Sequence, residues 1–332
     1  MTLLLVMFAT IGARADEGTL SGSGTAADPY LIGSDADWET FVSYINDKGG
    51  QYRYSYYKLT ADIKVTSMAG KNNNDNAFKG IFDGNGHTMT LNLTTDGSSN
   101  FFAPFRYVGG STFKRLHIAG KITSNSYYVA SLVGYHRWGT LNIYNCWSSV
   151  DIVCTKKTDN SFNAGFVGYS YDSNINININ NCRFDGSLQG AETGGCSGFV
   201  GQRNSNSSLM KISNCLFAPT QLTVATDNSY TFAYKSDVNT NNYYTTPLGK
   251  EQGTAIGNMT DSELLNKLGK GWEKKGDKVV PVFDIKNLST GSIECNTFWA
   301  YTGEDITVTP TVKDMDGNTV SSENYSVQVF RP

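Results

Sequence analysis

The chain has 332 residues, of which 17% are charged and 12% aromatic, and its formal net charge is −3. A chain with so few basic residues lacks the basic face that nucleic-acid binding needs, so we expect no nucleic-acid partner. No apolar run approaches the roughly 20 residues of a spanning helix, so we expect no membrane span.

The first 15 residues are predicted to be a signal peptide. Residues 2–11 are apolar, and Ala13-Arg14-Ala15 supplies the small-x-small pattern of a cleavage site. The alternative interpretation is a buried N-terminal strand. We expect a secreted or cell-surface protein, in which residues 16–27, rich in Gly and Ser, form a flexible leader.

A short strand and a helix are expected next. The strand covers residues 30–32, and Gly49-Gly50 end the helix. The helix is indicated by apolar residues at the i, i+3, i+4 and i+7 positions of one face: Trp38, Phe41, Val42 and Ile45. Such a helix would cap the open edge of a stacked sheet, and residues 57–65, which alternate, are predicted to be its first strand.

Residues 127–216 repeat one pattern three times. Each copy closes an apolar segment with a signature glycine, at Gly134, Gly168 and Gly201, so the period is 34 and then 33 residues. After a polar loop comes an alternating run that ends in Asn-Cys, at residues 141–146, 177–182 and 210–215. Alternation with a period of two indicates strands. A fixed period with two matching segments per copy indicates a solenoid.

Stacking the repeats predicts ladders of like residues inside the solenoid, about 4.8 Å apart. One ladder contains Ile143, Ile179 and Ile212, and the other contains Cys146, Cys182 and Cys215. One repeat cannot bury its apolar side alone, whereas a stack can. The predicted fold class is therefore all-β, a parallel β-helix. A leucine-rich-repeat horseshoe is the alternative, but no helical pattern lies between the strands.

The signature Gly165-Phe166-Val167-Gly168, with Asn-Cys downstream, resembles the GLUG-type repeat of bacterial surface and secreted proteins. Residues 24–32, 78–88 and 271–283 are similar to other segments of these proteins, and the resemblance covers most of residues 22–285. It departs at Ala130-Ser131, where a glycine is usual. The resemblance implies an extracellular right-handed β-helix over residues 28–285, often adhesin-like, and implies no catalytic residue.

The C-terminal part should contain a cap and a different module. Residues 260–269 are predicted to be a short helix with an N-cap at Thr260 and a stop at Gly269. Residues 279–283 are expected to close the end of the solenoid. Residues 298–314 resemble the opening strands of bacterial immunoglobulin-like modules. Because a whole sandwich needs about 100 residues, residues 286–332 are predicted to be a partial module, a β-sandwich-like tail.

Six cysteines in an exported chain suggest disulfides. Those at equivalent repeat positions are more simply explained as small apolar residues of one interior ladder. Adjacent turns bring Cα atoms within disulfide range, so the alternative of one disulfide bond stays open. No Cys-x-x-Cys spacing indicates zinc, and Asp83 and Asn85 are interpreted as turn residues rather than calcium ligands. We predict no metal and no cofactor.

No catalytic constellation stands out. His87, His117 and His136 lie in different turns without a serine or cysteine motif around them. The carboxylates that a glycosidase would pair are scattered over the repeats: Asp151, Asp172, Asp185 and Glu192. We therefore predict a protein that is not an enzyme. The alternatives are a polysaccharide lyase or glycoside hydrolase of the β-helix fold, and a structural spacer.

The candidate ligand-binding residues follow the signature glycines in successive turns. They are expected to form one contiguous exposed strip: Tyr135, Trp138, Tyr169, Tyr171 and Arg203. Flat apolar rings edged by hydrogen-bonding groups suit stacking on sugar rings. The opposing interpretation is that these rings pack locally over the loops. The predicted partner is a glycan or a host surface glycoprotein, and the sequence leaves the ligand's identity and the oligomeric state open.

Overall fold

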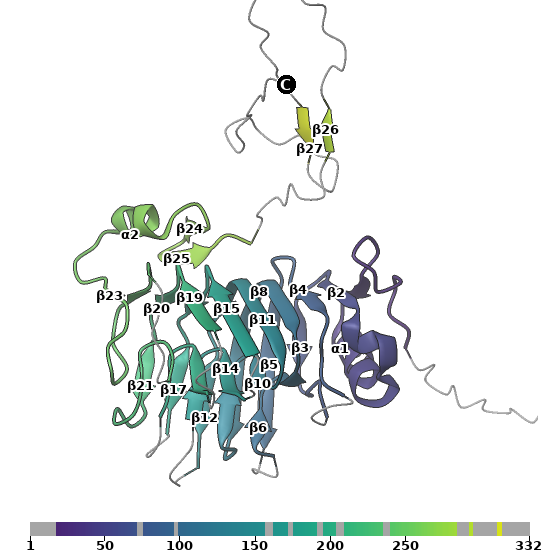
Figure 1. Ribbon diagram of the computed structural model, residues 1–332, viewed down its shortest axis with the longest axis horizontal. Coiled ribbons are helices and arrows are strands. Elements are labelled where there is room, and N and C mark those ends of the chain that lie inside the picture. Colours follow the sequence, from purple (N-terminus) through teal and green to yellow (C-terminus); the bar gives the residue numbers. More distant parts are fainter. Residues whose placement is uncertain are drawn as a thin grey trace, which may run out of the picture. The chain divides into compact units, whose positions relative to one another are not determined.

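The computed structural model describes residues 18–71, 76–95, 99–156, 162–171, 175–190, 195–203, 209–234, 240–283, 292–294 and 311–313. Its contacts divide the chain into two units, Met1–Phe283 and Asp284–Pro332. The first unit is a parallel β-solenoid with short helices, which confirms the predicted fold class (Figure 1).

Within the described residues, the largest sheet has 16 strands. Its main path runs through β1 (Tyr30–Ile32), β2 (Tyr56–Leu59), β4 (Ile81–Asp83), β8 (Ser111–Ser124), β11 (Gly139–Ser148), β16 (Arg183–Phe184), β20 (Leu216–Phe217), β22 (Tyr243–Tyr244) and β23 (Thr254–Ala255). The strands beside this path are β3 (Ile63–Val65), β5 (Thr88–Thr95), β12 (Asp151–Cys154), β15 (Ile175–Asn180), β17 (Ser187–Gln189), β19 (Leu209–Ser213) and β21 (Gln221–Thr223).

Two smaller parallel sheets complete the wall of the solenoid. The first contains β7 (Phe105–Val108), β10 (Val133–His136), β14 (Val167–Ser170) and β18 (Val200–Arg203). The second contains β6 (Phe101–Phe102), β9 (Tyr128–Ala130) and β13 (Phe162–Ala164). The strands of one repeat pair with the matching strands of the next repeat, so equivalent repeat positions lie side by side.

The register confirms the predicted interior ladders. Ile143 of β11 pairs with Ile179 of β15, which pairs with Ile212 of β19, and all three side chains are buried. On its other side Ile143 pairs with Phe113 of β8. The cysteines at the repeat ends are also buried: Cys146, Cys182 and Cys215. The apolar half of the alternating pattern therefore faces the core.

The asparagine of each Asn-Cys pair turns the chain at a corner of the solenoid. Asn145, Asn181 and Asn214 have φ values of 52°, 51° and 53°, in the left-handed region. Asparagine tolerates this region better than most residues, because its short polar side chain bonds locally. In the preceding turn Arg115 has φ 53° at the same corner, and its guanidinium donates to the Asp83 carboxylate at 2.9 and 2.6 Å. The Asn-Cys motif thus combines a bend with an inward side chain.

The N-terminal cap forms as predicted. The helix α1 (Asp35–Ser43) continues into a π-helical turn, η1 (Tyr44–Lys48), and a 3₁₀ turn, η2 (Gly50–Tyr54). The Ser34 hydroxyl accepts from the Asp37 N–H at 3.1 Å as the N-cap of α1. The apolar face of the cap is buried: Trp38, Phe41, Val42 and Ile45. The ladder of the main sheet, however, begins one strand earlier than predicted, because β1 pairs with β2.

The C-terminal segment of the first unit contains the predicted helix, α2 (Asp261–Leu268), and a hairpin of β24 (Trp272–Lys275) and β25 (Lys278–Pro281). Thr260 and Glu263 form a capping box at the start of α2. The prediction that residues 279–283 close the end of the solenoid is wrong. The hairpin instead lies on the flank of several turns of the solenoid (Figure 1). Two hydrogen bonds hold it there: Asn145 Nδ2 donates to Val282 O at 2.8 Å, and Arg183 Nη1 donates to Val279 O at 2.7 Å.

Several sequence predictions lie outside the described residues. These include the signal peptide of residues 1–15 and most of the immunoglobulin-like tail, of which the structure describes the antiparallel strands β26 (Ser292–Glu294) and β27 (Thr311–Lys313). Of the predicted leader, residues 18–27 are described, and Leu20 is buried with its N–H 3.2 Å from Tyr44 Oη. None of the described helices is long and apolar enough to span a bilayer.

The stacked register predicts a large stability loss for Ile179→Asp. Ile179 has a ladder partner on each side and no exposed surface, so an unpaired carboxylate there should cost about 3 kcal/mol or more. Lys211→Asp, on the exposed face beside Ile212, is the matched control and should melt like the parent chain. Thermal melting followed by circular dichroism measures both, and equal melting of the two variants would contradict the inward assignment.

The ladder also predicts unreactive thiols. The five described cysteines are free and buried, and burial raises the pKa values of the Cys146 and Cys182 thiols. Because the thiolate is the reactive form, these residues should be modified by a thiol reagent only on unfolding. Reagent uptake measured with and without denaturant tests this expectation, and full labelling of the native protein would contradict it.

Candidate functional site

Outward-facing aromatic rings gather where the two smaller sheets meet. We call this group the aromatic patch, and its members are Phe101, Tyr107, Tyr127, Tyr128, Tyr135, Tyr169 and Tyr171. They come from strands β6 and β7 and from the matching strands or adjoining loops of the next two turns. The repeat therefore builds the patch in the same way that it builds the core.

Strand register places three members of the patch in one row. Tyr107 pairs with Tyr135, and Tyr135 pairs with Tyr169. Their next neighbours along the strands, Val108 and His136, are fully buried. Tyr107 and Tyr169 are partly exposed, and the three rings contact the partly exposed rings of Phe101 and Tyr128, so the row lies on the outer side of the wall.

The rings contact one another across the two sheets. The Phe101 ring centroid lies 4.6 Å from that of Tyr135 in a stacked arrangement, and the Tyr128 centroid lies 4.4 Å from that of Tyr169. Tyr135 and Tyr169 are 5.2 Å apart, and Tyr171 stacks on Tyr169 at 6.1 Å. The result is a continuous aromatic surface spanning consecutive turns.

The signature glycines allow the backbone of the preceding turn to approach closely. A Cβ atom on Gly134 would lie 2.8 Å from Arg106 O, one on Gly168 would lie 3.1 Å from Gly134 O, and one on Gly201 would lie closer still to Gly168 O. Contacts this short require the neighbouring backbone to move. The repeat glycine is therefore explained by the close stacking of successive turns at this position.

A depression of about 320 Å³ opens at one side of the patch, lined by Asn100, Tyr127, Tyr128 and Gln202. The Tyr128 hydroxyl donates to Gln202 Oε1 at 2.8 Å. Lys156 Nζ lies 3.6 Å from the centre of the Tyr127 ring, so a cation adjoins the depression. Two amide side chains and two tyrosine rings thus line the depression, and an ammonium group adjoins it.

The structure joins three of the five predicted site residues, Tyr135, Tyr169 and Tyr171. Tyr135 is only 8% exposed and forms the base of the patch, whereas Tyr171 is 46% exposed. Trp138 has no ring contact with these tyrosines among the described residues and instead lies near two cations, Lys79 and Arg137.

Arg203 does not continue the row of tyrosines. It pairs with Ser170, whose own partner is His136, and both of those side chains are buried on the inner side of the wall. The outward position of that turn belongs to Gln202, which pairs with Tyr169. The expectation of one exposed strip of five residues was therefore too broad.

The site residues that sequence reasoning missed are Asn100, Phe101, Tyr107, Tyr127, Tyr128 and Gln202. The signal for Gln202 was available, because it follows Gly201 directly, just as Tyr135 and Tyr169 follow Gly134 and Gly168. Phe101 and Tyr128 come from the neighbouring sheet and carry no such spacing.

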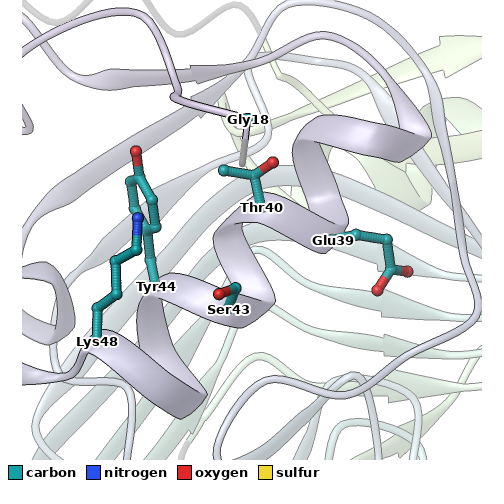
Figure 2. Close-up of a pocket in the computed structure, with 6 residues that line it drawn as sticks. All are labelled: Gly18, Glu39, Thr40, Ser43, Tyr44 and Lys48. Atoms are coloured by element: carbon teal, nitrogen blue, oxygen red, sulfur yellow. The ribbon is translucent and has the colours of Figure 1, made fainter. Parts of the chain in front are cut away.

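A second hollow of about 190 Å³ lies beside the cap helix α1 (Figure 2). The labelled side chains do not converge on one point: Glu39 extends away from Lys48 and Tyr44. The Glu39 carboxylate accepts from the Ser67 hydroxyl at 2.8 Å, and Lys48 Nζ lies 4.7 Å from the Tyr44 ring centre. These groups stabilise the cap, and the hollow is a gap between the helix and the segment around Gly18.

Two serine–histidine contacts bear on the enzyme alternative. His117 Nε2 lies 2.8 Å from Ser149 Oγ, and His136 Nδ1 lies 3.1 Å from Ser170 Oγ. The other ring nitrogen of His117 faces the Thr88 hydroxyl at 3.3 Å, not a carboxylate that would orient it as a base. Burial lowers the pKa of both histidines to about 4. Both pairs are therefore better suited to structure than to nucleophilic catalysis.

Of the four carboxylates considered as candidates from the sequence, the structure describes two, and each of these is held by neighbouring polar groups. Asp185 accepts from Trp147 Nε1 at 2.5 Å and forms ion pairs with Lys278 at 2.6 Å and Arg183 at 3.1 Å. Asp151 accepts from the Ser187 hydroxyl at 2.6 Å. Asp172 and Glu192 lie outside the described residues. In the part of the chain that the structure describes, no group of three His, Cys, Asp or Glu side chains is arranged to hold a metal ion.

No protein-family model matches the chain, and no curated protein matches it, so the GLUG-type resemblance stays a prediction. Among solved structures, the chain is similar to a crystal structure described as a "putative immunoglobulin A1 protease from Bacteroides ovatus". The match has a TM-score of 0.48 and 14% sequence identity, and covers 79% of this chain and 95% of that one. Similarity of this degree carries no information about activity.

The buried histidine His136 predicts acid sensitivity. Its ring lies between the Ser170 hydroxyl and the Trp138 carbonyl, and burial lowers its pKa to about 4, against about 6.5 in an unfolded chain. The unfolded state therefore binds a proton first as the pH falls. The free energy of unfolding should drop by about 3 kcal/mol between pH 6.5 and pH 4 through this group alone.

Denaturant unfolding at a series of pH values measures this slope, and His136→Gln should make it shallower. An equal slope in the parent chain and the variant would contradict the assignment of the loss to His136.

Proposed function

We propose that this protein is an exported glycan-binding protein and that the aromatic patch is its binding surface. The observation that carries the proposal is the continuous series of ring contacts from Phe101 through Tyr135 and Tyr169 to the exposed Tyr171. Rings on the outer wall are not needed to fill the core, which Ile and Phe ladders already occupy.

The chemistry of the patch suits a sugar. The apolar face of a pyranose stacks on a flat ring, while its hydroxyls need donors and acceptors at the ring edge. The exposed rings Tyr127 and Tyr171 offer such faces, and Asn100 and Gln202 offer amide groups in the depression that Tyr127 lines. The N-terminal apolar segment of residues 2–11 supports export.

Single contacts of this kind are weak. Each ring is expected to contribute about 0.5–1.5 kcal/mol beyond the area that it buries, so one sugar unit would bind poorly. An oligosaccharide lying across several turns, or a surface carrying many copies of either partner, would bind much more tightly through effective concentration. A glycan or a glycosylated surface protein is therefore the proposed partner.

The test removes the two exposed rings. Tyr127→Ala together with Tyr171→Ala should weaken binding to any glycan found on an array by about tenfold or more, because both stacking faces are lost. Leu209→Ala is the control, since Leu209 is a 65% exposed residue on β19 outside the patch. Calorimetric titration measures affinity, and a thermal melt checks that the fold is intact.

Unchanged affinity in the double variant would place the ligand elsewhere. A large fall in melting temperature would show that the two rings serve packing instead. Shortening of the glycan during the assay would favour the lyase or hydrolase alternative.

A further inference from the structure

A second group of surface side chains combines cations with aromatic rings. We call it the cation–aromatic cluster, and its members are Tyr54, Lys79, Arg137 and Trp138. Lys79 Nζ lies 5.0 Å from the centre of the Tyr54 ring and 4.8 Å from that of Trp138, and it donates to Tyr54 Oη at 3.0 Å. The Arg137 guanidinium lies 5.7 Å from the Trp138 ring centre.

Three separate segments bring this cluster together. Tyr54 ends the turn η2, Lys79 precedes strand β4, and Arg137 and Trp138 follow strand β10. The Trp138 indole lies against Gly109, where an added Cβ would come within 2.7 Å of Nε1. The fold therefore fixes the tryptophan against the wall with both cations beside it.

The positive charge of the cluster is not neutralised locally. In the described part of the chain, neither Lys79 nor Arg137 forms an ion pair with a carboxylate. The carboxylate of Asp83, at the other end of strand β4, pairs with Arg115 at 2.6 Å and Lys114 at 3.4 Å. The hydrogen bond from Lys79 lowers the pKa of Tyr54, as expected beside a free cation. Two cations that share one aromatic ring without a counter-charge favour an anionic ligand.

We propose that the cation–aromatic cluster binds an acidic saccharide, a sugar that carries a carboxylate or sulfate group. Lys79 and Arg137 would hold the anionic group through charge-assisted hydrogen bonds. The Tyr54 ring, which is 55% exposed, offers an apolar face for the sugar ring.

A compact anion fits this cluster better than an extended polyanion does. The whole chain has a net charge of −3, so it repels a long nucleic acid beyond the immediate cluster. The inference does not rest on the aromatic patch, because Trp138 makes no ring contact with the patch among the described residues.

The experiment titrates the whole chain with an oligogalacturonate, with its neutral methyl ester and with a sulfated oligosaccharide. We expect the acidic forms to bind and the ester to bind at least about tenfold more weakly. The first two ligands test the need for charge, and the third distinguishes sulfate from carboxylate. Raising the salt concentration should weaken acidic binding, because the contacts lie at the surface.

The double variant Lys79→Gln with Arg137→Gln should lower the affinity for the acidic ligand by about tenfold or more. Lys121→Gln together with Lys211→Gln, at exposed positions of β8 and β19, is the matched control, because it removes the same two charges outside the cluster, and it should leave the affinity unchanged. Circular dichroism confirms the fold of each variant.

Three results would overturn the inference: equal binding of the neutral ester, unchanged affinity in the Lys79 and Arg137 variant, or tighter binding of a short oligonucleotide. The Tyr127 and Tyr171 variant is measured in parallel. If it alone loses the acidic ligand, that ligand lies on the aromatic patch, and this inference fails while the proposed function stands.

Discussion

The backbone pairing between parallel strands of successive turns is the interaction on which the rest of this structure depends. It holds Ile143, Ile179 and Ile212 side by side in the interior. Because side chains alternate between the two faces of a strand, a slip of one residue would exchange these isoleucines with polar neighbours such as Asn178. The buried ladder therefore fixes the register, and the register in turn places Tyr135 beside Tyr169 on the outer face. The candidate binding surface is a consequence of how the core is stacked.

Much of this arrangement was predictable, because it depends on spacing within one repeat. The Asn-Cys pair specifies a left-handed bend followed by an inward thiol, and α1 follows from apolar residues at helical spacing. The same logic identifies the error at Arg203. Counted from the signature glycine, it is equivalent to Ser170 and not to Tyr169, so it does not continue the row of tyrosines. Aligning the three turns on their glycines would have selected Gln202 instead.

Other features depend on contacts between segments with no common spacing. Phe101 and Tyr128 belong to the three-stranded sheet, whereas Tyr135 and Tyr169 belong to the four-stranded sheet. The rings meet because the two sheets adjoin in the folded chain. The C-terminal hairpin docks on the flank through the buried carboxylate of Asp185, which meets Lys278 from 93 residues further along the chain. No periodicity in the sequence indicates these pairings. They follow from the tertiary fold.

We propose that a sugar is held on the outer wall of the solenoid, at the junction of the two smaller sheets. The most direct test is a crystal structure of the chain with a glycan that it binds. We expect a sugar ring stacked on Tyr127 or Tyr171, with its hydroxyls at hydrogen-bond distance from Asn100 or Gln202. A sugar bound at a different part of the solenoid, with the aromatic patch facing solvent, would contradict it.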